Sequence, residues 1–150
     1  MRILVPVDGS TNSLNAVSFI ASRQTLLGSN PDIELLNIQL PLPARACRLV
    51  GQDAIQRYYE DEAEKVFEPA RKILQKVGFK AVESFVVGEP SPSIAKAAEK
   101  TSADLIVILD DGRLHAVGTH DELLAKDTIY QEIYHSQMKG GDADGEAIRR

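Results

Sequence analysis

The stretch ILVPVDGST, residues 3–11, decides the fold class of this 150-residue chain. Residues 3–7 form a short apolar run rich in β-branched side chains, which is typical of a strand buried on both faces in a parallel sheet. The Asp-Gly pair at 8–9 then breaks the strand, and Ser10 and Thr11 are residue types that cap the start of a helix. A buried strand followed at once by a capped helix predicts the first unit of an α/β domain.

Strands and helices alternate along the first two thirds of the sequence. Further apolar runs predict strands at residues 33–40, 81–87 and 105–109, separated by segments of helical periodicity. Strand–helix units at this spacing imply right-handed crossovers and a parallel sheet covered by helices on both faces. We therefore expect a single doubly wound α/β domain over residues 1–150.

Two of the expected helices carry start signals. Asp53 and Gln56 form a capping box for a long amphipathic helix, and Pro69 should kink this helix because proline lacks an N–H and crowds the preceding turn. Ser91 and Pro92 predict the start of the next helix, with serine as the N-cap and proline in the first helical position.

The pattern changes after residue 109. The Asp-Gly pair at 111–112 lies between two apolar runs and is typical of a hairpin turn. Residues 114–117 would then pair antiparallel with residues 105–109. The fifth strand of the sheet is therefore expected to be an antiparallel edge strand and not a further parallel one.

Two C-terminal helices are expected after this hairpin. Thr119 and Glu122 form a capping box for the first helix, and residues 128–138 carry apolar side chains at helical spacing for the second. Residues 139–150 are rich in glycine and charge, and we predict that this tail is disordered.

Composition limits the classes of function. With 43% hydrophobic and 26% charged residues, the chain is typical of a globular domain. Its net charge of -5 argues against partners that need a basic face, namely nucleic acid and anionic membrane surfaces. No signal-peptide pattern opens the chain, no apolar run approaches the roughly eighteen residues of a membrane span, and Cys47 is the single cysteine. These features point to the cytoplasm.

Asp8 is the strongest site candidate from the residues alone, because it ends a central strand where doubly wound sheets bind ligands. The alternative is that Asp8, Ser10 or Thr11 caps the following helix, as such residue types commonly do. Asp110 and Asp111 either bind a metal or form the hairpin turn, and the three histidines have no ligand spacing. We expect no metal site and no catalytic residue.

The first part of the chain resembles the universal stress protein family. The resemblance rests on the opening ILVPVDGS, the strand ELLNIQL and the stretch VVGEPSPSIAKAAEKTSADLIV, in that order within residues 1–107. It implies a flavodoxin-like fold with sheet order 3-2-1-4-5, here with strands 1–4 parallel and strand 5 antiparallel. Members of this family often form homodimers, and many bind ATP or AMP, so the resemblance implies that this protein could do both.

The resemblance carries over two elements of a nucleotide site. In members that bind nucleotide, the aspartate after the first strand meets the ribose or adenine, and the end of the second strand lines the adenine pocket. The matching residues of this chain are Pro6, Val7, Asp8, Ile38 and Gln39. A third element of the family, a G-x-x-G-x9-G-[ST] loop after the fourth strand, holds the phosphates.

That phosphate loop is incomplete in this sequence. Leu109 stands where the family has its first glycine, Gly112 aligns with the second, and Glu122 stands where the third is expected. Asp110 and Asp111 add negative charge beside the place of the phosphates, which opposes anion binding. We therefore expect a non-enzymatic protein that requires no cofactor and binds AMP or ATP weakly.

Residues from about 103 to 141 are similar to a different family, at the C-terminal end of ABC transporter ATP-binding domains. The segment is ADLIVILDDGRLHAVGTHDELLAKDTIYQEIYHSQMKGG, with the D-[DN]-G-[RK] turn and the G-T-H-[DE]-E-L-L helix start of that family. The similarity implies structure and not ATP hydrolysis, because no G-x-x-x-x-G-K-[ST] loop occurs in the chain.

The two resemblances meet at the sequence SADLIV, and together they predict a chimera. Residues 1–107 would form a body of the universal stress protein type, and residues 108–138 would form a hairpin and helices like those at the end of the transporter domain. Two functions stay open on this interpretation. The first is a weak adenine-nucleotide binder of the universal stress type. The second is a natural or engineered hybrid domain that retains no ligand. Any homodimer would avoid the family's usual edge strand, because the hairpin strand replaces it.

Overall fold

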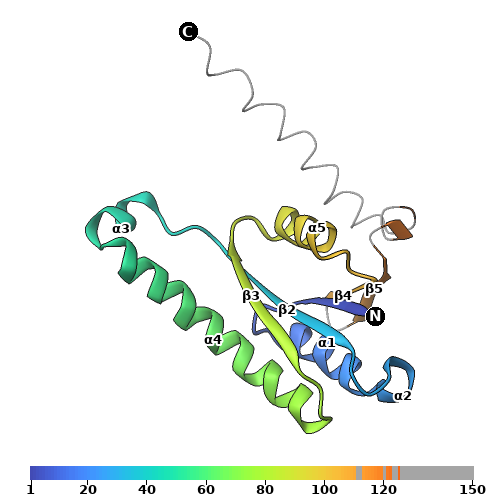
Figure 1. Cartoon of the computed structure of the whole chain (residues 1–150). Coiled ribbons are helices and arrows are strands. Elements are labelled where there is room, and N and C mark those ends of the chain that lie inside the picture. Colours follow the sequence, from blue (N-terminus) through green and yellow to red (C-terminus); the bar gives the residue numbers. More distant parts are fainter. Residues whose placement is uncertain (111–112, 120, 123–124, 126–150) are drawn as a thin grey trace.

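The computed structural model describes residues 1–110, 113–119, 121–122 and 125 (Figure 1). Strands alternate with helices along the chain, which confirms the α/β class with a parallel sheet. The elements are β1 (Arg2–Pro6), α1 (Thr11–Ala21), α2 (Gln24–Leu27), β2 (Asp32–Gln39), α3 (Ala44–Leu49), α4 (Gln52–Lys76), β3 (Ala81–Val87), α5 (Pro90–Thr101), β4 (Leu105–Asp110) and β5 (Arg113–Gly118).

The strands form one sheet in the order β3-β2-β1-β4-β5. β1 is central and pairs parallel with β2 on one side and with β4 on the other, and β3 pairs parallel with β2. β5 pairs antiparallel with β4, with a register irregularity between Ile108 and Leu109. The chain changes direction across the sheet between β1 and β4, so their carboxyl ends form the topological switch point at which such sheets bind ligands.

Helices cover the two faces of the sheet unequally. α1 and α4 pack on one face, over a large apolar core that includes Val5, Leu35 and Phe67. On the opposite face, the described helix is α5, which packs on β1 and β2 (Figure 1). The buried cluster under α5 is small and consists of Leu4, Leu36, Ala98 and Ile106.

The start of α4 differs from the sequence prediction. The helix begins at Gln52, and the Gly51 carbonyl accepts hydrogen bonds from the Ala54 and Ile55 N–H groups at 3.0 and 3.2 Å. The expected capping box of Asp53 and Gln56 is therefore wrong, and Gln56 Nε2 instead donates to Glu60 Oε1 at 2.9 Å. Pro69 lies inside the helix and does not end it, since α4 continues to Lys76.

The start of α5 also differs. The helix begins at Pro90 with Glu89 as the N-cap, two positions before the predicted cap, Ser91. The physical reason is that Pro90 and Pro92 both lack an N–H, and the N–H groups of a first helical turn have no partner in the helix. Either proline suits the first turn, so the helix starts at the earlier one.

The second capping box is confirmed. The Thr119 N–H donates to Glu122 Oε2 at 3.0 Å, and the Glu122 N–H donates to Thr119 Oγ1 at 3.2 Å. The turn residues 111–112, the predicted last helix and the predicted tail lie outside the described residues. Among the described helices, none is both long and apolar enough to cross a membrane.

Candidate functional site

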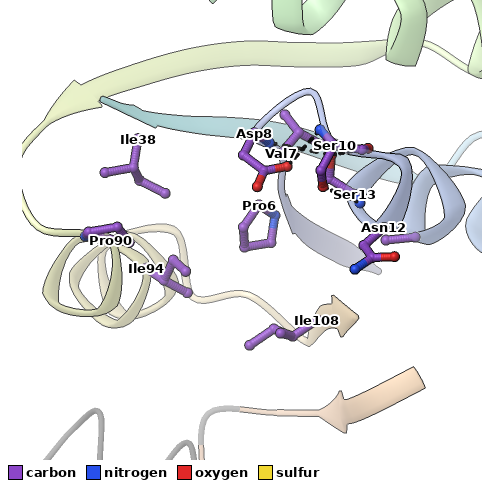
Figure 2. A pocket seen from close by; sticks show the side chains of 11 residues that line it. Pro6, Val7, Asp8, Ser10, Asn12, Ser13, Ile38, Pro90, Ile94 and Ile108 are labelled. Atoms are coloured by element: carbon purple, nitrogen blue, oxygen red, sulfur yellow. Dashed lines mark hydrogen bonds between the residues drawn. The ribbon is translucent and has the colours of Figure 1, made fainter. Parts of the chain in front are cut away.

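A cavity of about 330 Å³ opens at the carboxyl ends of β1 and β4 (Figure 2). Its wall is formed by the end of β1 and the loop after it, the start of α1, the end of β2, the start of α5, and β4. Its volume falls at the lower end of the roughly 300–1,000 Å³ that is usual for small-molecule sites. The cavity therefore has both the place and the size of a ligand site.

One side of the cavity is apolar. Pro6 ends β1, Ile38 lies near the end of β2, Ile108 lies on β4, and Pro90 and Ile94 come from the start of α5. Figure 2 shows these five side chains around a common space. The three isoleucines also pack against the small cluster under α5, so the sheet and the helix hold this wall in place.

The other side is polar and belongs to the turn between β1 and α1. Asp8 Oδ1 accepts a hydrogen bond from the Ser10 N–H at 2.9 Å, and the Asp8 N–H donates to Ser13 Oγ at 3.4 Å. Ser10 is the N-cap of α1, because its Oγ accepts from the Ser13 N–H at 3.2 Å. The capping role left open by the sequence therefore falls to Ser10, and Asp8 lies on the cavity wall.

Asp8 keeps its charge in this turn. Partial burial raises the pKa of the carboxyl, but the hydrogen bonds from Ser10 and Ser13 outweigh it, and the net pKa of Asp8 lies below its ordinary value of 3.8. Within the described part of the wall, this carboxylate is the one charged side chain. The cavity thus offers a negative acceptor opposite an apolar surface.

Asn37 of β2 holds the turn between β1 and α1 through a hydrogen bond to its backbone. Its Nδ2 donates to the Val7 carbonyl at 2.9 Å, and the Val7 N–H donates to the Leu36 carbonyl at 2.8 Å. Gly9 has a φ of +81°, and a Cβ there would lie 3.4 Å from Val66 Cγ2. Only glycine adopts this conformation without strain, so the chain reverses tightly after Asp8.

Sequence reasoning missed Asn37, although a signal was present. It is one of two amides in the strand ELLNIQL, where it lies between leucine and isoleucine, and a polar group in such a strand must find a partner when buried. The side chain is 3% exposed, and its Oδ1 has no partner among the described residues.

The structure brings together four of the six predicted site residues. Asp8, the two residues before it and Ile38 all line the cavity. Gln39 does not, because its Nε2 donates to the Tyr59 carbonyl at 2.8 Å and so ties the end of β2 to α4. Gly112 lies outside the described residues.

The wall formed by α5 and β4 was not predicted. Ile94 lies in a segment for which the sequence analysis predicted only a helix, starting at Ser91 and Pro92. The signal lies in topology: the carboxyl ends of parallel strands and the starts of the following helices meet at one edge of the sheet. In the part of the chain that the structure describes, histidine, cysteine, aspartate and glutamate form no group of three that could hold a metal.

Comparison with known families identifies most of the chain. The model of the universal stress protein family matches residues 1–119. A hypothetical protein solved as a test case of structural genomics is 28% identical, with a TM-score of 0.58 over 75% of this chain and 76% of that chain. A universal stress protein family protein from Arabidopsis thaliana with AMP bound is 12% identical, with a TM-score of 0.55 over 87% of this chain and 82% of that chain, which shows a shared fold.

Curated relatives match only short stretches. The mycobactin import ATP-binding/permease protein of Mycolicibacterium thermoresistibile is 58% identical over 36 residues, which is 24% of this chain and 4% of that protein. The chain therefore spans a very small part of the length of this ABC transporter protein, and the match does not establish membership of the transporter family.

Proposed function

The chain belongs to the universal stress protein family, and on this basis we propose that it binds the adenosine part of AMP or ATP weakly and catalyses no reaction. The observation that carries the proposal is the cavity in which the Asp8 carboxylate faces the apolar wall of Ile38 and Ile94. The related Arabidopsis thaliana structure with AMP bound supports an adenine nucleotide as the ligand class.

The two sides of the cavity suit the two parts of adenosine. The adenine ring is flat and offers apolar faces, so it would pack on the isoleucine wall. The ribose hydroxyls and the adenine amino group are hydrogen-bond donors, and the ionised Asp8 carboxylate is an acceptor only. A hydrogen bond to a charged acceptor is stronger than one between neutral groups, so Asp8 would provide the main polar contact.

The phosphates would gain little from this site. In the described part of the wall, Asp8 is the one charged group, and its charge repels phosphate. The family's glycine loop is missing at the end of β4, where the sequence has Asp110, the last residue of the strand, followed by Asp111. Backbone N–H groups of such loops are what usually hold phosphates, so ATP should bind no more tightly than AMP or adenosine.

The absence of catalysis is part of the proposal. Phosphoryl transfer needs cations or metal ions to neutralise the developing charge and a residue that orients the nucleophile. The described residues of the cavity wall include neither a cation nor a histidine. We expect no ATP hydrolysis above background, with or without magnesium, when phosphate release is measured.

Isothermal titration calorimetry with adenosine, AMP and ATP tests the proposed ligand. We expect similar dissociation constants for the three ligands, and a loss of roughly tenfold in Asp8→Asn, since one charge-assisted hydrogen bond is removed. Asp61→Asn is the matched control, because Asp61 is exposed on α4. ATP binding clearly tighter than AMP binding, or an Asp8→Asn variant that binds like the wild type, would contradict the proposal.

A second function is favoured by the short transporter match and the incomplete phosphate loop. On this alternative the chain is a natural or engineered hybrid that keeps the fold and no ligand. Thermal unfolding separates the two, because a ligand at a hundred times its dissociation constant stabilises the protein by about 2.7 kcal/mol. No change of melting temperature with adenosine, AMP or ATP at millimolar concentration would favour the hybrid.

A further inference from the structure

Within the described residues, β3 is an edge strand without the usual protection of such strands. It pairs with β2 in unbroken register from Ala81 to Val87. The strand contains no proline and no lysine, and among the described strands none pairs with its outer side. Figure 1 shows it at the side of the sheet away from β5. A long, regular and unblocked edge is a template for pairing with another strand.

The open face of β3 carries two exposed valines on either side of Ser84, whose Oγ donates to Glu34 Oε1 at 2.7 Å. Ala81 and Phe85 point towards the core under α4. Val82 and Val86 point to the opposite face, where α5 covers β1 and β2, and they are 62% and 37% exposed. Val87, at the end of the strand, is 43% exposed. The edge therefore combines free backbone groups with exposed valines.

The backbone groups that face outward can be assigned. The Gly88 N–H, next after the strand, donates to the Gln39 carbonyl of β2 at 2.9 Å. Backbone polar groups alternate in direction along a strand, so the even-numbered residues of β3 face β2. The N–H and C=O groups of the four odd-numbered residues from 81 to 87 therefore face the free edge.

We propose that β3 pairs antiparallel with β3 of a second copy of this chain, about a two-fold axis at Ser84. This register uses all seven residues of the strand and brings each outward-facing residue opposite another, as a hydrogen-bonded pair requires. On the open face it places Val82 beside the partner's Val86, so that exposed apolar side chains cover one another.

A second copy is favoured as the occupant because the strand is complementary to itself in charge as well as in shape. The one charged residue of β3, Glu83, lies opposite the partner's Phe85 and not opposite another carboxylate. Arg71 pairs with Glu83 within each copy, with Nη2 to Oε2 and Nε to Oε1 distances of 2.7 Å, and its guanidinium also pairs with Glu64 of α4. Pairing therefore brings no unpaired charge into the interface.

Cysteine cross-linking tests the register directly. Ser84 would sit opposite its own copy at a non-hydrogen-bonded position, where the Cα atoms are about 4.5 Å apart, within the range of a disulfide. Val82 would lie roughly 13 Å from its own copy along the strands. In a Cys47→Ser background, we expect Ser84→Cys to give a disulfide-linked dimer on mild oxidation and Val82→Cys to stay unlinked.

Sedimentation equilibrium tests the interface without cross-linking. Val86→Lys puts two charges into the proposed interface and should weaken dimerisation roughly tenfold or more. Leu26→Lys is the matched control, because Leu26 is 76% exposed on α2, and it should leave dimerisation unchanged. A chain that is monomeric at all concentrations, equal cross-linking of both cysteine variants, or a Val86→Lys variant that dimerises like the wild type would each overturn the proposal.

Discussion

The two faces of the sheet differ in how much apolar surface their helices bury. On one face α1 and α4 cover a core that draws on all four parallel strands. On the other, α5 covers a cluster of four buried residues, and both the apolar wall of the cavity and the exposed side chains of Val82 and Val86 lie on this side. The difference teaches that one face provides most of the stability, whereas the thinner face leaves the space in which a ligand and a partner can bind.

Two adjacent leucines of β2 measure this difference most directly. Leu35 faces the large core and Leu36 the small cluster, and both are fully buried. We expect Leu35→Ala to lower the free energy of unfolding by about 4–5 kcal/mol and Leu36→Ala by about 2–3 kcal/mol. The smaller cost follows because side chains beside an open cavity can relax into the vacated space. Urea unfolding of both variants checks this, and an equal or larger loss in Leu36→Ala would break the comparison.

Asn37 should matter next, because it joins the large-core side of β2 to the turn that carries Asp8. Asn37→Ala leaves the Val7 carbonyl without its 2.9 Å donor and should cost about 1–3 kcal/mol in urea unfolding. The exposed amide of Asn15 on α1 is the control, and Asn15→Ala should change stability by less than about 0.5 kcal/mol. Equal effects of the two changes would show that the turn does not depend on Asn37.

The cap of α1 gives a smaller effect. Ser10→Ala removes the oxygen that accepts from the Ser13 N–H and should cost about 1 kcal/mol. Thr11→Ala, one residue further on and inside the helix, should be nearly neutral. Thermal unfolding of the two variants compares their stabilities. A larger loss of stability in Thr11→Ala than in Ser10→Ala would show that Ser10 is not the cap.

The smallest expected effect is the pH dependence due to Asp8. Because its pKa is lower in the folded state, the group stabilises the protein above its unfolded pKa of about 3.9. That contribution is lost as the pH falls through the lower folded pKa. The stability difference between wild type and Asp8→Asn should therefore shrink as the pH falls below about 5. A difference that is constant over this range, or that grows on acidification, would contradict the assigned hydrogen bonds.

The sequence predicts the strands and helices of this molecule better than it predicts which residues of different elements come into contact. Apolar runs indicated the four parallel strands, because burial on both faces leaves a continuous pattern. The α5 start was placed late, because two prolines suit the same turn. Ile94 and Ile108 were not assigned to the site, since periodicity shows which face of an element is apolar but not which distant residue it meets. Gln39 matched the family pattern, yet its side chain donates a hydrogen bond to the Tyr59 carbonyl of α4 and does not line the cavity.

The central claim is that the thinner face binds adenosine at the Asp8 turn. Amide chemical-shift mapping by NMR, with adenosine added to the isotope-labelled chain, tests it most directly. We predict the largest shifts at Asp8, Ser10, Ile38 and Ile94, and little change in the core under α4, for example at Phe67. Shifts that cluster elsewhere, or no shift at millimolar adenosine, would contradict the claim.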